Sequence, residues 1–184
     1  MSANTPRIRV FLADDHPVIR QGLASLLSGH ADLEVVGETG LGTDIVSHVS
    51  ALAPNVVLLD VRMPGLDGIA VTRRLRQACP ETKVIILTTY DEDEYVMGAL
   101  QAGAYAYLLK SASRESLVTS IRAVAAGERL LSPQLVSKVL QRVENLARRE
   151  TRHESGLTEE EFQVLELMVE GASNHEIAAQ LHFS

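Results

Sequence analysis

Residues 56–69, VVLLDVRMPGLDGI, decide the fold class. The run Val56–Leu59 is apolar without a break, which is typical of a strand covered on both faces of a parallel sheet. The run ends at Asp60, and Asp67 then offers the kind of side chain that caps the start of a helix. The stretch therefore predicts a buried strand, an acidic strand end and a loop that leads into a helix.

The same alternation continues in both directions along the chain. Four further apolar runs predict strands, and five amphipathic stretches with apolar residues at helical spacing predict helices. The predicted strands are 8–13, 33–37, 83–87 and 105–109, and the predicted helices are 17–28, 43–52, 67–78, 92–102 and 114–126. This alternation predicts an α/β fold, a flavodoxin-like (βα)5 domain with parallel strand order 2-1-3-4-5. We prefer that order because it makes the first and third strands neighbours, and both end in carboxylates.

Polar side chains follow four of the five predicted strands. Asp14 and Asp15 follow the first strand, Asp60 the third, Thr88 the fourth and Lys110 the fifth. Because sites in open α/β sheets form at the carboxyl ends of the strands, we expect these residues to meet. Three carboxylates close together repel one another, and a hard cation such as Mg²⁺ would relieve that repulsion.

The same set of residues suits phosphoryl transfer. Lys110 offers a positive charge and Thr88 a hydroxyl for the oxygens of a transferring phosphoryl group. An aspartate can act as the nucleophile and carry the group as an aspartyl phosphate. Position favours Asp60 in that role, with Asp14 and Asp15 as the pair that holds the metal.

Each residue taken singly also has a plain structural interpretation. An Asp-Asp pair can be a solvated strand end, Lys110 a surface lysine and Thr88 the start of a loop. We assign His16 to the turn before a helix, since nothing in the sequence pairs it with a metal partner. The complementary set at four strand ends favours the functional interpretation.

The pattern changes after Gly127. A predicted helix at 133–148 is followed by a linker without apolar residues at 148–156. Thr158 and Glu161 form the sequence pattern of a capping box before an apolar helix, and a second short helix follows Ser173. We therefore divide the chain into 1–127, a linker helix and linker at 128–156, and an incomplete all-α fragment at 157–184.

Composition limits the class of protein. The chain has 184 residues, a net charge of −7 and a single cysteine, Cys79, so an internal disulfide is excluded. The sequence has neither a secretory signal nor an apolar run long enough for a membrane span, and we expect a cytoplasmic protein with no membrane partner. Residues 157–184 contain six acidic and no lysine or arginine side chains, so they lack the charge that binds phosphate backbones.

Four stretches closely resemble the receiver domain of bacterial response regulators of the NarL/FixJ type. They are FLADDHPVIRQGL at 11–23, VVLLDVRMPGLDGI at 56–69, VIILTTYD at 84–91 and GAYAYLLK at 103–110. The resemblance covers residues 7–127. It implies that a sensor histidine kinase donates a phosphoryl group to the protein in the presence of Mg²⁺.

The resemblance also implies a role for individual residues. It makes Asp60 the phosphoacceptor, with Asp15 and Asp60 holding Mg²⁺ directly and Asp14 holding it largely through water. The remaining implied roles are a metal contact from the backbone carbonyl of Arg62, a switch hydroxyl on Thr88, a salt-bridging ammonium on Lys110 and a switch aromatic at Tyr107. Ser111 stands where many family members have proline.

The tail LTEEEFQVLELMVEGASNHEIAAQLHFS, at 157–184, resembles the first two helices of a LuxR-type helix-turn-helix domain. It departs from the family pattern at Glu159-Glu160 and at Phe162. The chain stops where the recognition helix would begin, so we expect a truncated form of a transcription factor. In the full-length protein, phosphorylation would promote a homodimer that binds promoter DNA, whereas this chain would not bind DNA.

Two other functions stay open at this point. One is a stand-alone receiver that acts only through protein–protein contacts, without DNA binding. The other is a hydrolase that uses an aspartyl phosphate, which Arg62 disfavours because a haloacid-dehalogenase-like enzyme would carry a second acid at that position. Our preferred interpretation is a signalling phosphoacceptor that catalyses only its own phosphotransfer and dephosphorylation.

Overall fold

The computed structural model of the chain describes residues 6–89, 93–130, 137, 158–169 and 180. The chain divides into two compact units, Met1–Val136 and Ser137–Ser184. Within the described ranges, no helix has the length and apolar character needed to cross a membrane.

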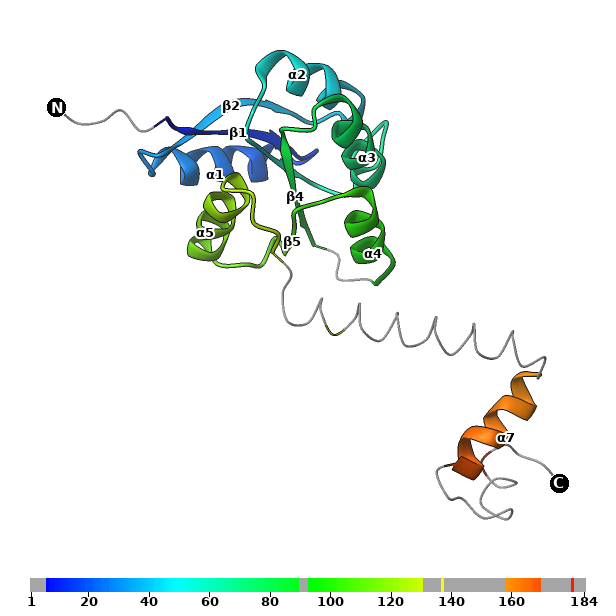
Figure 1. Cartoon of the computed structure of the whole chain (residues 1–184). Helices are drawn as coiled ribbons and strands as arrows, with labels where there is room; N and C mark the ends of the chain where they lie inside the picture. Colours follow the sequence, from blue (N-terminus) through cyan, green and yellow to red (C-terminus); the bar gives the residue numbers. More distant parts are fainter. Residues whose placement is uncertain (1–5, 90–92, 131–136, 138–157, 170–179, 181–184) are drawn as a thin grey trace. The chain divides into compact units, whose positions relative to one another are not determined.

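The first unit is built on a parallel sheet of five strands. The strands are β1 (Ile8–Ala13), β2 (Leu33–Thr39), β3 (Val56–Leu59), β4 (Lys83–Thr88) and β5 (Ala106–Leu109). Their order is β2-β1-β3-β4-β5, which confirms the predicted topology (Figure 1). Strand β1 pairs with β3 from Val10↔Val56 to Ala13↔Leu59, so these two central strands end side by side.

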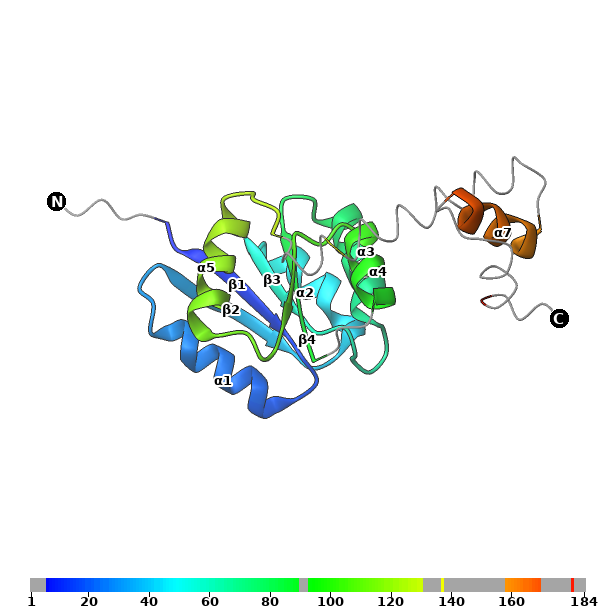
Figure 2. The ribbon, with the colours of Figure 1, turned by 90° about the horizontal axis from the view of Figure 1, so that it is seen from below.

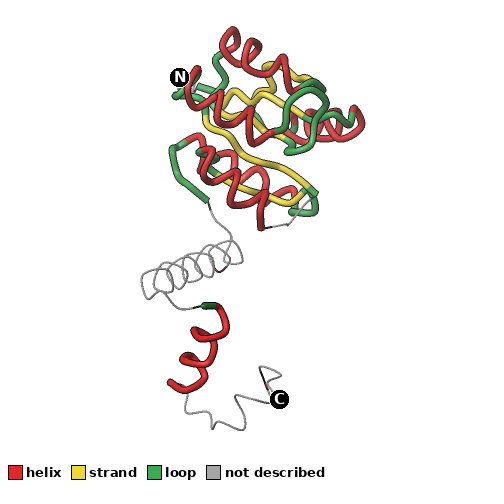
Figure 3. The backbone as a smooth tube through the Cα atoms, turned by 90° about the vertical axis from the view of Figure 1, so that its right-hand side faces the viewer, coloured by secondary structure: helices red, strands yellow, loops and turns green. Residues whose placement is uncertain are grey.

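Helices cover both faces of the sheet. They are α1 (Pro17–Ser28), α2 (Ile45–Leu52), α3 (Gly68–Ala78), α4 (Asp93–Ala102) and α5 (Arg114–Ala125), with a short 3₁₀ turn η1 (Gly42–Asp44) before α2. Helices α1 and α5 lie on one face, and α2, α3 and α4 lie on the other (Figure 2). The strands therefore run between two layers of helices (Figure 3). The predicted flavodoxin-like α/β fold is therefore confirmed.

Two apolar cores hold these layers together, because neighbouring residues of a strand point to opposite faces. The core under α2, α3 and α4 contains Phe11, Val57, Leu59, Ile86, Ile45, Val49, Val71, Leu75 and Val96, all almost fully buried. The core under α1 and α5 contains Val10, Leu12, Leu58, Ile85, Leu27, Leu117, Val118 and Ile121. Every residue of Val56–Leu59 is buried, as expected for a central parallel strand.

Local signals set most of the element ends. The side chain of Asp67 accepts a hydrogen bond of 2.9 Å from the Ala70 amide, which confirms it as the cap of α3. Gly103 has φ +102° directly after α4, in the left-handed region that glycine tolerates. Strand β2 continues to Thr39, two residues beyond its predicted end, because residues 37–39 keep pairing with Phe11, Leu12 and Ala13.

Two glycines let the loops at the carboxyl end of the sheet pack closely. The amide of Gly42 donates a 3.1 Å hydrogen bond to the Pro64 carbonyl, and a Cβ at Gly42 would lie 2.2 Å from the Leu66 carbonyl oxygen. A Cβ at Gly68 would lie 2.3 Å from the carbonyl oxygen of Asp60. The loop that joins β3 to α3 is therefore pressed against its neighbours by contacts that only glycine allows.

The described part of the second unit is centred on helix α7 (Glu159–Val169). The Thr158 amide donates a 2.8 Å hydrogen bond to Glu161 Oε2, and the Glu161 amide reaches Thr158 Oγ1 at 3.3 Å. This reciprocal pair confirms the predicted capping box. The predicted linker at 148–156 lies outside the described residues, as do nearly all of the predicted helices at 133–148 and after Ser173.

Candidate functional site

The carboxyl ends of the strands are held in register by backbone hydrogen bonds that continue past the strands. The Asp60 amide donates a 2.8 Å hydrogen bond to the Ala13 carbonyl, which fixes the end of β3 beside β1. The Lys110 amide donates a 2.7 Å hydrogen bond to the Thr88 carbonyl, which fixes the end of β5 beside β4. Residues from distant parts of the sequence are thereby brought to one edge of the sheet.

Three of the predicted site residues meet directly. Lys110 Nζ lies 2.6 Å from Asp14 Oδ2 and 2.6 Å from Asp60 Oδ2. The side chains of Asp14 and Asp60 are only 4% and 5% exposed, and that of Lys110 is 11% exposed. One ammonium group therefore bridges two buried carboxylates, as the positions of these residues at the strand ends predicted.

The charge of this lysine is stabilised by the acids around it. Burial by itself lowers the pKa of Lys110, but the hydrogen bonds to Asp14 and Asp60 and the charges of both acids oppose it, so that the pKa is raised. Lys110 therefore stays protonated at neutral pH and can attract negative oxygens at this edge of the sheet.

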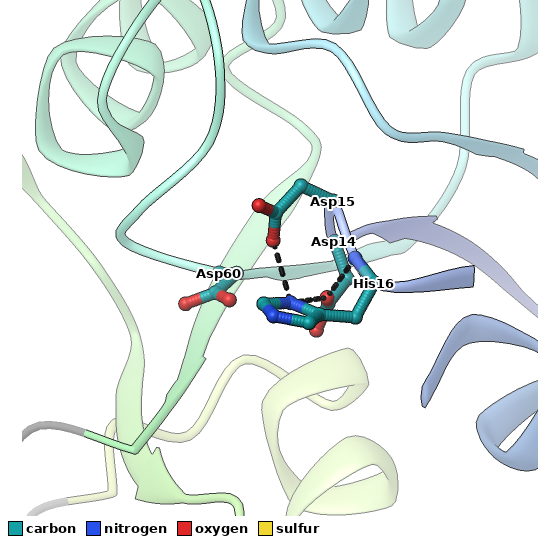
Figure 4. Close-up of side chains that lie close together, drawn as sticks. All are labelled: Asp14, Asp15, His16 and Asp60. Carbon is teal, nitrogen blue, oxygen red and sulfur yellow. Dashed lines mark hydrogen bonds and ion pairs between the residues drawn. The ribbon is translucent and has the colours of Figure 1, made fainter. Parts of the chain in front are cut away.

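Asp15 and His16, which directly follow Asp14 in the sequence, are the more exposed members of the site (Figure 4). His16 Nδ1 lies 2.7 Å from Asp15 Oδ1 and 3.2 Å from Asp14 Oδ1. The His16 amide also donates a 2.9 Å hydrogen bond to Asp14 Oδ1. The imidazole, 62% exposed, thus lies beside the buried Asp14.

The donor set fits a cation. Asp14, Asp15, His16 and Asp60 each offer one ligand atom, and these four atoms lie within 4.8 Å of one another. The three carboxylates outweigh the single ammonium of Lys110, so the pocket carries excess negative charge. Among the described residues, none donates a hydrogen bond to the buried Asp15 Oδ1, although His16 is its ion-pair partner. A divalent cation would bind this oxygen and offset the excess charge.

Arg62 and Thr88 lie at the same edge of the sheet as the acids, and Tyr107 lies on the edge strand β5. The Arg62 amide points to Asp60 Oδ1 at 3.4 Å, while its guanidinium donates a 2.9 Å hydrogen bond to the Tyr95 hydroxyl and stacks on that ring. Thr88 is fully buried at the end of β4, and Tyr107 is 3% exposed on the edge strand β5. The structure therefore places Arg62 and Thr88 at the predicted edge and packs Tyr107 into the core.

The structure confirms the predicted position of His16 in the turn before α1, but the contact of its ring with the two acids was not predicted. The prediction left it in the turn before α1 without a metal partner, whereas the structure puts its ring against both Asp14 and Asp15. The signal was present, because a histidine directly follows the acidic pair. Its orientation depends on side-chain torsions, which periodicity does not report.

Comparison with known proteins gives the family. Residues 10–122 match the model of the response regulator receiver domain, and residues 155–184 match that of the bacterial regulatory proteins of the luxR family. The chain belongs to the LuxR family of response regulators. This confirms the resemblance seen in the sequence, and the response regulator combines a receiver with a LuxR-type DNA-binding region.

Individual relatives agree with this assignment. The response regulator is 38% identical to the transcriptional regulatory protein LiaR of Bacillus subtilis, over 95% of this chain and 82% of LiaR. The solved receiver domain of the putative response regulator NarL from Mycobacterium tuberculosis matches with a TM-score of 0.65 and 37% identity, over 67% of this chain and all of that one. A structure of two RcsB dimers bound to two parallel DNAs matches with a TM-score of 0.67 and 28% identity, over 97% of this chain and 84% of that one.

Proposed function

We propose that Asp60 is the phosphoacceptor through which this response regulator receives its signal. The observation that carries the proposal is the Lys110 ammonium, which touches both Asp60 and Asp14 at 2.6 Å in a pocket of excess negative charge. A carboxylate that is buried and fixed at a strand end is held ready to react with an incoming phosphorus atom. The donor is a phosphorylated histidine of a sensor kinase.

The transfer moves a phosphoryl group from a histidine nitrogen to a carboxylate oxygen. An Asp60 carboxylate oxygen forms a bond to phosphorus, the bond from phosphorus to the donor's imidazole nitrogen breaks, and the imidazole leaves with the electron pair. Lys110 and the Thr88 hydroxyl bind the phosphoryl oxygens, and Lys110 keeps its proton because its pKa is raised. The response regulator catalyses only this transfer and the later hydrolysis of its own aspartyl phosphate.

Mg²⁺ is the cation we assign to the acidic pocket. Asp14, Asp15, Asp60 and the Arg62 backbone carbonyl would hold it, and the ion would neutralise charge on the phosphoryl oxygens. Asp14 and Asp60 already share the charge of Lys110, so these acids would hold both an ammonium and a cation close to the Asp60 carboxylate. The hydroxyl of Thr88 and the ring of Tyr107 are the switch elements that respond to the new charge on Asp60.

The output of the phosphorylated receiver is dimerisation and DNA binding. The RcsB structure is one of dimers on DNA, and it matches 97% of the present chain at 28% identity. Phosphorylation would shift the population of receiver conformations towards the one that pairs. Beryllofluoride with Mg²⁺ should raise the dimer fraction measured by light scattering; no change in mass, with beryllofluoride bound at Asp60, would count against phosphorylation-driven pairing.

The phosphoacceptor itself is tested by intact-mass spectrometry after incubation with acetyl phosphate and Mg²⁺. The wild-type protein should gain one phosphoryl group, and Asp60→Asn should gain none. Asp67→Asn is the matched control, because Asp67 lies on the same loop, is exposed and can be replaced by another good helix cap. A phosphorylated Asp60→Asn protein would refute the assignment.

A further inference from the structure

The residue that the phosphoacceptor chemistry leaves unused is His16. Its mostly exposed imidazole lies beside the acids, with Nδ1 2.7 Å from Asp15 Oδ1 and 3.2 Å from Asp14 Oδ1 (Figure 4). The sequence contains six histidines. Among the histidines that the structure describes, His16 alone belongs to the group of potential metal ligands.

These separations match those between ligands of one metal ion. In octahedral coordination with bonds of about 2.1 Å, adjacent ligand atoms lie about 3.0 Å apart and opposite ones about 4.2 Å apart. The distances from His16 Nδ1 to the two aspartate oxygens lie on either side of the first value. All four ligand atoms lie within 4.8 Å of one another, a little more than the distance of about 4.2 Å between opposite ligands of one ion. Little movement is needed for all four side chains to share one ion.

A role for the imidazole in helix stability is not supported by its contacts. His16 is the residue before α1, yet its side chain makes no capping hydrogen bond, and Pro17 begins the helix without needing one. His16 makes two contacts of hydrogen-bond length with Asp14 Oδ1. The backbone amide donates at 2.9 Å, which any residue except proline would keep, and the ring Nδ1 lies at 3.2 Å. The ring itself is mostly exposed.

We propose that His16 Nδ1 is a metal ligand that makes the pocket prefer first-row transition-metal dications, such as Co²⁺ and Ni²⁺, over Mg²⁺. Imidazole nitrogen suits these ions, whereas Mg²⁺ takes oxygen ligands and keeps its water. Mg²⁺ would therefore bind through the carboxylates and the Arg62 carbonyl, and His16 would add affinity only for the transition metals. This inference rests on the cation site of the proposed function and adds a fourth side chain to it.

The test compares two metals on three proteins at one fixed pH of 8. Calorimetric titration with Co²⁺ and with Mg²⁺ is carried out on the wild type, His16→Ala and the control His30→Ala. His30 lies in the turn before β2, at the opposite end of the sheet from the acids. His16→Ala should weaken Co²⁺ binding by about tenfold or more and change Mg²⁺ binding by less than about twofold, while His30→Ala should match the wild type.

Visible absorption separates this site from metal bound at the other histidines. The Co²⁺ spectrum of the wild type should contain a component that is lost in His16→Ala and kept in His30→Ala. An equal loss of affinity for both metals, an unchanged Co²⁺ affinity, or tighter binding of both metals in His16→Ala would overturn the inference. Failure of the proposed function gives a different result, in which the wild type with Mg²⁺ and acetyl phosphate gains no phosphoryl group.

Discussion

The sheet carries an ion-pair group at each of its two ends, and the two differ in charge balance. At the amino end, Arg122 holds Asp32 through two hydrogen bonds of 2.7 and 2.9 Å, and both side chains are about half exposed, at 46% and 47%. At the carboxyl end, Lys110 faces the buried Asp14 and Asp60. The first group is neutral and fastens α5 to the start of β2, whereas the second keeps unmatched negative charge out of water. Of these two groups, only the one at the carboxyl end carries excess charge that a bound cation would offset.

The largest expected effect comes from removing the cation of the buried group. Lys110→Met leaves Asp14 and Asp60 without their partner, and loss of one member of a buried ion pair costs about 3 kcal/mol of unfolding free energy. Urea denaturation of the metal-free protein measures this loss. The double variant Lys110→Met, Asp60→Asn should recover part of it, because one of the two uncompensated charges is gone.

Mg²⁺ sharpens the same experiment. A cation that binds only the folded protein raises stability by an amount that grows with the logarithm of its affinity, and Lys110→Met removes a competing positive charge from the acidic group. Saturating Mg²⁺ should therefore raise the melting temperature of Lys110→Met more than that of the wild type. An equal rise in both proteins would show that Lys110 and the cation do not share the charge of the acids.

An intermediate effect is expected from the packing beneath Asp60. In Gly68→Ala, the new Cβ would lie 2.3 Å from the Asp60 carbonyl oxygen and 2.9 Å from the Val61 Cα, and backbone atoms cannot move aside easily. We expect a loss of about 1–3 kcal/mol in urea denaturation. Gly22→Ala is the control, since a Cβ at Gly22 in α1 meets nothing within 4 Å. That variant should be more stable than the wild type, by about 0.5–1 kcal/mol.

The smallest effect is expected at the exposed pair. The hydrogen bonds from Arg122 lower the pKa of Asp32, so the folded protein holds this carboxylate charged to lower pH than the unfolded chain does. The resulting stability is present above the ordinary aspartate pKa and is lost as the pH falls through the lowered value. Asp32→Asn should therefore cost a little stability at pH 7, and its difference from the wild type should shrink as the pH falls below about 4. A large loss at pH 7 would contradict the comparison of the two ends.

The sequence predicted the part of the site that strand positions determine. Apolar runs locate the strand ends, and a parallel sheet aligns those ends, so the meeting of Asp14, Asp60 and Lys110 follows from periodicity. The position of the His16 ring could not be predicted, because it depends on side-chain torsions in a turn. The contact of Gly42 with Leu66 was also out of reach, because it joins two loops with no repeating pattern.

That loop contact has a consequence for how tightly the site can bind. Gly42 binds the segment 64–66 through a hydrogen bond, and Gly68 packs against Asp60. The loop that follows Asp60 is therefore already ordered before a ligand binds. A site that is already rigid loses little conformational entropy when it binds a ligand. Lengthening the stretch between Arg62 and Leu66 with glycines would restore conformational freedom, and association would then carry an ordering cost that the native protein avoids.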